Sequence, residues 1–172
     1  MLEFRRAWTL IAAVGLLQVA GGILGVVTPL GLESLGVRAP VIGLIAACHA
    51  AGFMAGAASA PMALHVFGNI RVYSAAAAMT AACALAMDLY QDALFWTLFR
   101  VIQGAAFAWM FASVESWLSV SLAPRHRGVV TGVYHVVAKA ALMLGPFLAA
   151  GVSALDSRSY LWCGVFLSLS LV

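Results

Sequence analysis

Charged residues are scarce in this sequence of 172 residues, of which six are acidic and nine are lysine or arginine. An ordinary soluble domain contains about 25% charged and about 45–50% apolar residues, whereas this chain is 9% charged and 65% hydrophobic. So few charges cannot keep the surface of a folded chain in water, which excludes a soluble enzyme, a nucleic-acid-binding protein and a disordered chain. The excess apolar surface must face lipid, as in an integral membrane protein.

Cysteine is also rare, and residues that carry catalysis or bind metal do not cluster. Cys48, Cys83 and Cys163 each lie inside an apolar run. This placement predicts reduced, buried side chains, because a disulfide framework uses an even number of cysteines in loops. The sequence has no Ser/His/Asp set, no metal-binding spacing and no phosphate-binding loop, so we expect no enzymatic activity, no cofactor and no bound metal.

Long runs with few or no charges recur along the chain and predict membrane-spanning helices. A helix needs about 20 residues to cross a bilayer of about 30 Å, and backbone polar groups in lipid must be satisfied within the segment. The expected helices cover residues 7–32, 40–64, 71–88, 93–120, 128–154 and 159–172. The first is longer than the apolar core of a signal peptide, about 7–15 residues, so we expect it to be retained.

The last of these runs is short and stops without a polar tail. Its residues form only about 21 Å of helix at about 1.5 Å per residue, which does not span a bilayer. We therefore expect residues 1–172 to form a six-helix N-terminal bundle with a truncated sixth helix, in a fragment whose C-terminal half is absent.

Basic residues are distributed unevenly over the expected loops. Five would lie on the side of the N-terminus: Arg5, Arg6, Arg71, Arg125 and Arg127. Only Arg38 and Arg158 would lie on the opposite side. The positive-inside rule then places the N-terminus in the cytoplasm, with the helices in the cell (inner) membrane. The net charge of +3 thus reflects topology, and we expect lipid rather than nucleic acid as a partner.

Three charged residues interrupt the fourth and fifth runs: Arg100, Glu115 and Lys139. A charge near the bilayer centre costs about 2.5–3.5 kcal/mol on insertion scales. Each charge therefore marks either a substrate or proton pathway, or a structural pair or helix end. Arg100, with Gln103 beside it, Glu115 and Lys139 are therefore candidates for such a pathway.

Uncharged polar residues extend this candidate pathway. His135 and Lys139 are spaced i, i+4 and share a helix face, and Glu115 falls at a depth similar to that of His135, so a Glu115–His135 contact is a hypothesis. Gln18 and His49 lie on stripes of small residues, whose default role is helix packing. The alternative is that both line a polar cavity between helices. A lone membrane histidine such as His135 is more often a packing residue held by a hydrogen bond.

Local motifs resemble those of the major facilitator superfamily, in its N-terminal half. Arg100 to Gly104 resembles the R-x-x-Q-G motif of the fourth helix, and Gly132 to Ala150, with Gly145 and Pro146, resembles the antiporter motif of the fifth, with alanine in place of three glycines. The stretch 61–71 occupies the place of G-x-x-x-D-R-x-G-R. Gly68 matches that motif and Arg71 ends the stretch, whereas His65 replaces the acidic residue and Pro61 the leading glycine.

The stretch 99–118, together with 41–44, is most similar to the YcaD-like branch of that superfamily. The resemblance implies secondary transport of a small solute by alternating access between two six-helix bundles, driven by a proton or solute gradient, and the motif of the fifth helix favours antiport or efflux. On this resemblance, Arg100 is the first candidate for a substrate or proton-coupling role, and Glu115 for carrying a proton or for gating. It further implies that helices one, two, four and five line the cavity and that three and six pack outside. Gly68, Arg71, Gly132, Gly145 and Pro146 are the expected gating and packing residues.

Two rival hypotheses remain open at this point. In the first, the chain is a complete small membrane protein that assembles or anchors partners without transport. In the second, it is a six-helix unit that transports only as a homodimer.

Overall fold

Each long apolar run of the sequence folds into one α-helix. The computed structural model describes residues 2–121, 124–151 and 158–170. The helices are α1 (Leu2–Ser34), α2 (Ala39–Phe67), α3 (Asn69–Leu89), α4 (Ala93–Ser121), α5 (Pro124–Gly151) and α6 (Arg158–Leu169). The described ranges contain no strand. The predicted all-α membrane fold with six helices is thereby confirmed.

Five of these helices, α1 to α5, are long and apolar enough to cross a membrane, and α6 is a shorter apolar helix. Residues 152–154 and 171–172, which the sequence assigns to the fifth and sixth helices, lie outside the described residues. Pro61 lies inside α2, which continues to Phe67, beyond the end expected at residue 64.

The tight connections are closed by local hydrogen bonds. The last hydrogen bond of α2 runs from the N–H of Gly68 to the carbonyl of Leu64 at 2.9 Å. The backbone φ angle of 80° at Gly68 then ends the helix. Asp92 caps α4, because its Oδ1 accepts the N–H groups of Leu94 at 2.9 Å and Phe95 at 3.2 Å. The indole N–H of Trp96 donates to two carbonyl groups at the end of α3, which ties the two helices together.

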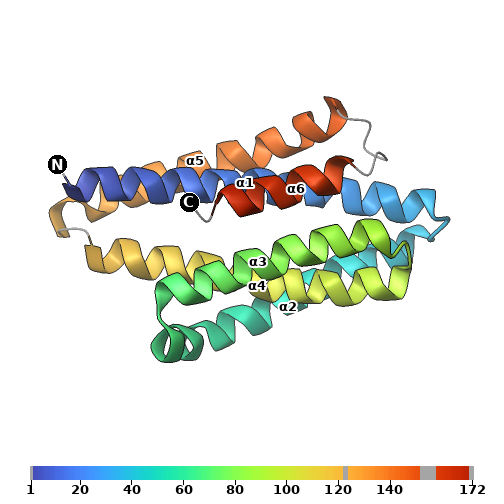
Figure 1. The fold of residues 1–172 in the computed structure, drawn as a ribbon, viewed down its shortest axis with the longest axis horizontal. Coiled ribbons are helices and arrows are strands. Elements are labelled where there is room, and N and C mark those ends of the chain that lie inside the picture. The colour runs from blue at the N-terminus through green and yellow to red at the C-terminus, as the bar shows by residue number, and fades with distance from the viewer. Residues whose placement is uncertain (1, 122–123, 152–157, 171–172) are drawn as a thin grey trace.

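The helices form two layers (Figure 1). One layer contains α1, α5 and α6, and the other contains α2, α3 and α4. Within the layers, α1 packs on α5 and α6 while α4 packs on α2 and α3, and the pair α3 and α6 joins the layers. The helices in the middle of each layer, α1 and α4, are therefore the central helices of the packed core.

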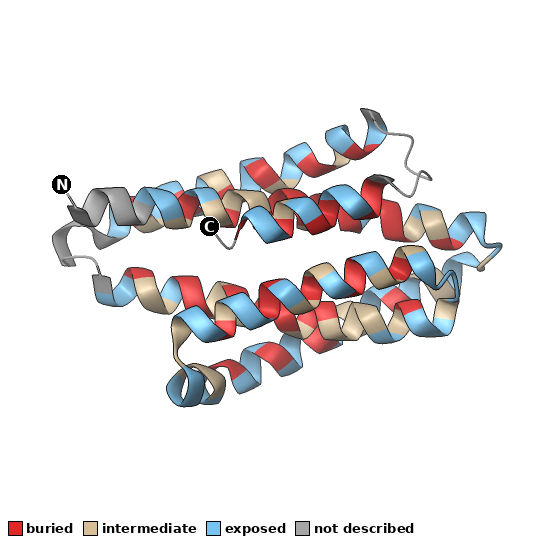
Figure 2. Ribbon diagram, in the orientation of Figure 1, coloured by how far each residue is buried: buried red, intermediate tan, exposed pale blue. Residues whose placement is uncertain are grey.

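Burial differs strongly between helices (Figure 2). In the apolar centre of α1, 56% of the residues are buried, against 28% in α5 and 17% in α2. Leu17 and Leu24 of α1 have no exposed surface, whereas α2 and α5 leave long apolar side chains uncovered. In a membrane protein, these uncovered faces of α2 and α5 are available to lipid or to another helical bundle.

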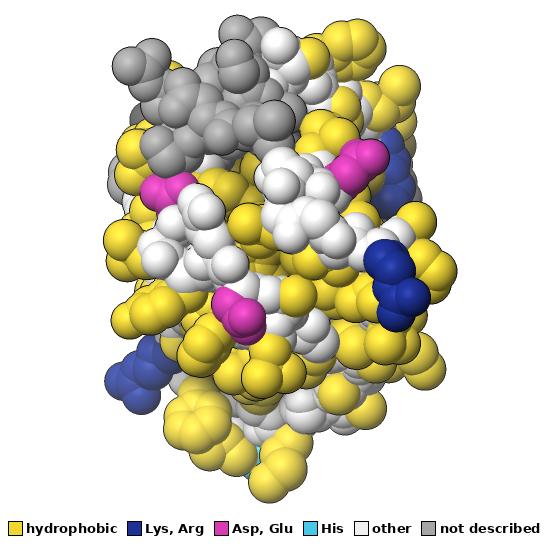
Figure 3. Space-filling model, turned by 90° about the vertical axis from the view of Figure 1, so that its right-hand side faces the viewer, with side chains coloured by type: hydrophobic (Ala, Val, Ile, Leu, Met, Phe, Trp, Pro, Cys, Tyr) yellow, Lys and Arg dark blue, Asp and Glu magenta, His cyan; other side chains and the backbone are white. Residues whose placement is uncertain are grey.

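The α1–α2 and α3–α4 connections lie at one end of the bundle, which Figure 3 views directly. Acidic side chains are spread over this end among apolar side chains. Glu33, Asp88 and Asp92 lie at the helix ends here. The other end, where the N-terminus and the α2–α3 connection lie, is called the N-terminal end below, and the one in Figure 3 the opposite end.

Glycines set the two closest helix approaches. A Cβ added to Gly104 of α4 would collide with the carbonyl oxygen of His49 in α2. A Cβ added to Gly145 of α5 would lie 2.6 Å from the Cα of Gly22 in α1. Small residues allow membrane helices to approach at backbone contact, so these positions fix the α2–α4 and α1–α5 pairs.

Candidate functional site

A hollow of about 390 Å³ lies between α1, α2, α4 and α5. Its polar lining residues are Gln18, Glu115, Tyr134, His135 and Lys139. The rest of the lining is aromatic or alanine: Phe53, Ala57, Ala108, Phe111, Ala112 and Ala138. An apolar pocket with a few convergent polar groups is the usual form of a small-molecule site.

Four of the seven expected pathway residues therefore lie together. Gln18 comes from α1, Glu115 from α4, and His135 and Lys139 from adjacent turns of α5. Gln18 is buried, whereas the three ionisable side chains are exposed. In the described part of the chain, no lining residue belongs to α3 or α6.

The ionisable groups of the hollow lack partners of their own. Within the described residues, Glu115, His135 and Lys139 form no ion pair within 4.0 Å and no side-chain hydrogen bond. The ring of His135 lies 4.8 Å from that of Tyr134. Glu115 and His135 thus share one hollow without the direct contact hypothesised from the sequence.

The other three expected pathway residues, His49, Arg100 and Gln103, form a second polar group nearer the opposite end. Arg100 Nη1 donates to Gln103 Oε1 at 3.4 Å, and His49 Nδ1 lies 3.0 Å from the carbonyl oxygen of Arg100. Gln103 is fully buried, and its Nε2 lies 3.8 Å from the sulfur of Met87 in α3. The Nε of Arg100 is buried without a hydrogen-bond partner in the described part of the chain.

Phe107 of α4 separates the two polar groups. Its side chain is buried, and its ring centroid lies 6.2 Å from that of His49 and 6.2 Å from that of Phe111, which lines the hollow. On the α1 side, a Cβ added to Gly21 would lie 3.3 Å from the Phe107 ring. An apolar ring therefore fills the space between the hollow and the Arg100 group.

The five residues expected to gate or pack lie in different settings. Gly145 is buried at the α1–α5 contact and Pro146 follows it inside α5. Gly68 ends α2 with a positive φ, and Arg71 is exposed in the first turn of α3. Gly132 is exposed, and a Cβ there would meet nothing within 4 Å, so no helix packs against Gly132 in the described residues.

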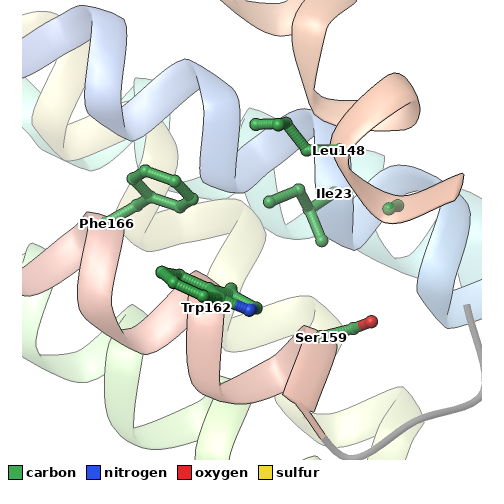
Figure 4. A pocket seen from close by; sticks show the side chains of 6 residues that line it. Ile23, Leu148, Ser159, Trp162 and Phe166 are labelled. Carbon is green, nitrogen blue, oxygen red and sulfur yellow. The ribbon is translucent and has the colours of Figure 1, made fainter. Parts of the chain in front are cut away.

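A second hollow, of about 170 Å³, lies between α1, α5 and α6 (Figure 4). Ile23, Leu148, Trp162 and Phe166 surround it with apolar side chains, and Ser159 supplies a single hydroxyl. None of the described residues that line this second hollow is charged, and few could orient a polar solute. Among the described residues, no three His, Cys, Asp or Glu side chains come together to hold a metal ion.

Two residues of the site could not be singled out from the sequence. Tyr134 precedes His135 and lines the hollow from α5 with only 2% of its surface exposed. Phe107 is one of several aromatic residues in an apolar run. For Tyr134 the sequence offers one signal. It lies four residues before Ala138, and so on the same side of the helix as Ala138 and the neighbouring Lys139.

Several apolar spans around a hollow with uncompensated charges define an integral membrane protein of the transporter class, since ionisable residues within spans mark substrate and ion pathways. A family model described as Major Facilitator Superfamily matches residues 10–172. The chain belongs to the major facilitator superfamily. None of the curated proteins compared with the chain matches it.

Proposed function

We propose that the chain moves a small solute across the cell (inner) membrane by alternating access, with the hollow between α1, α2, α4 and α5 as the solute site. The observation that carries this proposal is the group of Glu115, His135 and Lys139, three ionisable side chains that line one hollow and form no ion pair or hydrogen bond among the described residues. A charge in a span is costly, so unpaired charges are retained where water, a proton or a solute compensates them.

Proton coupling through Glu115 is the second part of the proposal. Among the described residues, Glu115 is the one acidic side chain that lines the hollow, and the other polar lining residues are Gln18, Tyr134, His135 and Lys139. A carboxylate that alternately takes a proton and a solute group couples the two movements in opposite directions. This supports antiport or efflux, with the N-terminus in the cytoplasm as the distribution of arginine indicates.

The route through the bundle passes Phe107. We infer that its ring closes the hollow towards the opposite end and that movement of the ring opens the way to Arg100, Gln103 and His49. Arg100 then offers a second cationic binding group, whose buried Nε has no hydrogen-bond partner in the described residues. Gly145 lies where α5 contacts α1 and Pro146 follows it inside α5, so a change in that contact would accompany opening.

The exposed faces of α2 and α5 support completion of the hollow by a second bundle. The C-terminal half of a longer protein is the expected source, and a second copy of the same bundle is the alternative. We also propose membership of the YcaD-like branch, on the resemblance of residues 99–118.

Transport by the full-length protein in proteoliposomes tests the function. Vesicles loaded with a pH-sensitive dye and given an imposed pH gradient are exposed to solutes of four classes: amino acids, sugars, nucleosides and quaternary amines. We expect one class to cause proton movement, and Glu115→Gln to abolish it, because the amide cannot take up a proton. Glu33→Gln, at an exposed acidic residue on α1, is the matched control and should leave the proton movement unchanged.

Other outcomes separate the rival functions. Solute movement without proton movement would contradict proton coupling but would still support a transport function. The absence of any solute movement, with the protein folded, would favour an anchoring or assembly protein. Transport by vesicles that contain only the six-helix chain would favour the homodimer.

A further inference from the structure

We propose that the hollow selects a small zwitterion, with a cationic group bound at Glu115, an anionic group at Lys139 and an apolar body between them. This inference rests on the proposed function, since it names the substrate class of the same site. It adds the charge pattern of the solute, which neither the fold nor the family specifies.

The two charges stand on different walls of the hollow. Glu115 belongs to α4 and Lys139 to α5, and these two helices contact each other little. Within the described residues no carboxylate lies within 4.0 Å of Lys139 and no cation within 4.0 Å of Glu115. Each charge is therefore available to a solute.

The direction of the helices aims both charges at the middle of the hollow. At about 1.5 Å per residue, the backbone of Lys139 lies roughly 13 Å deeper from the N-terminal end than that of Glu115. Side chains lean towards the N-terminus of their own helix. Since α4 and α5 run in opposite directions, Glu115 leans away from the N-terminal end and Lys139 towards it, so the two charges converge without meeting.

The surface between the charges suits an apolar body. Phe53 and Phe111 lie with ring centroids 6.2 Å apart at an interplanar angle of 56°, and Tyr134 adds a third ring. The volume of about 390 Å³ is within the usual range for small-molecule pockets. Gln18 and His135 offer further hydrogen bonds to the ends of a bound molecule.

A neutral or singly charged solute fits this lining less well. A neutral solute would leave both charges without an oppositely charged partner, and a singly charged solute would leave one of them so. Sites built for a polar group reject analogues that lack it, because their own groups are then left unsatisfied. The arrangement thus favours a molecule that satisfies both charges.

Four matched compounds of one size test the assignment: 4-(aminomethyl)benzoate, which has both charges, 4-(aminomethyl)benzamide, which is a cation, 4-methylbenzoate, which is an anion, and neutral 4-methylbenzamide. Binding to the full-length protein in lipid nanodiscs is measured by calorimetry at neutral pH. We expect the zwitterion to bind about tenfold more tightly than either singly charged compound, as one charged hydrogen bond contributes.

Two variants locate the charges. Glu115→Gln should lower the affinity for the zwitterion to that for 4-methylbenzoate, and Lys139→Gln should lower it to that for 4-(aminomethyl)benzamide. The matched controls Glu33→Gln and Arg38→Gln alter exposed residues near the opposite end and should leave all four affinities unchanged. The order of the four compounds on the unaltered protein is decisive by itself, so the test does not depend on the folding of the variants.

Equal binding of the zwitterion and the neutral amide would overturn the inference, and so would no binding of any of the four. Variants that leave the order of the compounds unchanged would overturn the assignment of Glu115 and Lys139. Failure of the zwitterion inference is distinguishable from failure of the proposed function. The proposed function is tested separately, by solute-driven proton movement in proteoliposomes with the four broader solute classes. Transport of sugars alone, for example, would support the transport function and contradict the preference for a zwitterion.

Discussion

The contact between α2 and α4 depends on the absence of a side chain at Gly104, and Gly104→Ala is the sharpest test of the helix packing. A Cβ there would meet the carbonyl oxygen of His49 and would lie 2.8 Å from the backbone nitrogen of Phe53. Ordinary Cβ contacts are 3.4–4 Å. Since the obstructing atoms belong to backbone, the two helices must separate by roughly 1 Å, which is the scale of overpacking in a close-packed interior.

The expected cost follows from three effects. Overpacking costs about 1–3 kcal/mol. Separation also weakens the 3.0 Å contact between His49 and the Arg100 carbonyl, worth about 0.5–1.5 kcal/mol, while alanine gains about 1 kcal/mol over glycine in helix propensity. We therefore expect Gly104→Ala to lower the free energy of unfolding by about 2 kcal/mol.

The matched control is Gly132→Ala on α5, where a Cβ meets nothing within 4 Å. Only the propensity effect remains there, so this variant should be stabilised by up to about 1 kcal/mol. Unfolding of both variants by a denaturing detergent, followed by circular dichroism, measures the two changes. A Gly104→Ala protein as stable as the parent, or equal destabilisation at both positions, would refute the packing argument.

Substitutions at three further positions test other parts of the fold by the same measurement. Gly145→Ala should lower the free energy of unfolding by about 1–3 kcal/mol, because the added Cβ would lie 2.6 Å from the Cα of Gly22; no destabilisation would mean that α1 and α5 do not touch there. Gly68→Ala should cost about 1 kcal/mol, because φ is 80° at this position and an L-residue is strained there. Asp92→Ala should cost about 1 kcal/mol by removing the cap of α4, and Asp92→Ser should restore most of the stability; loss without restoration would argue against capping.

The helices could be predicted from the sequence because lipid imposes a simple rule. Backbone groups must pair within each span, so every long uncharged run becomes a helix, and the chain folds into α1 to α6. Helix ends were less predictable: α2 continues past Pro61 to Phe67, since hydrogen bonding carries a membrane helix beyond its most apolar part.

The candidate site was predictable only in part. Glu115, His135 and Lys139 stand out in the sequence because polar groups are rare in spans, and the structure brings them to one hollow. The separation of Arg100 from that hollow depends on how α4 turns between its neighbours. Phe107 lies between the hollow and the Arg100 group, but it cannot be distinguished in the sequence from the other aromatic residues of an apolar run, because the burial of a ring depends on tertiary packing.

Alternating access through the hollow is the central claim, and the accessibility of a single cysteine at Ala112 tests it most directly. Cys48, Cys83 and Cys163 are replaced by serine in the full-length protein, Ala112→Cys is introduced on the lining of the hollow, and Ala76→Cys, at a residue of α3 without exposed surface, is the control. A membrane-impermeant maleimide is applied to intact cells and to inverted vesicles. We predict labelling of the cysteine at position 112 from both sides of the membrane and of the one at position 76 from neither, whereas labelling at 112 from one side only, under all conditions, would contradict alternating access.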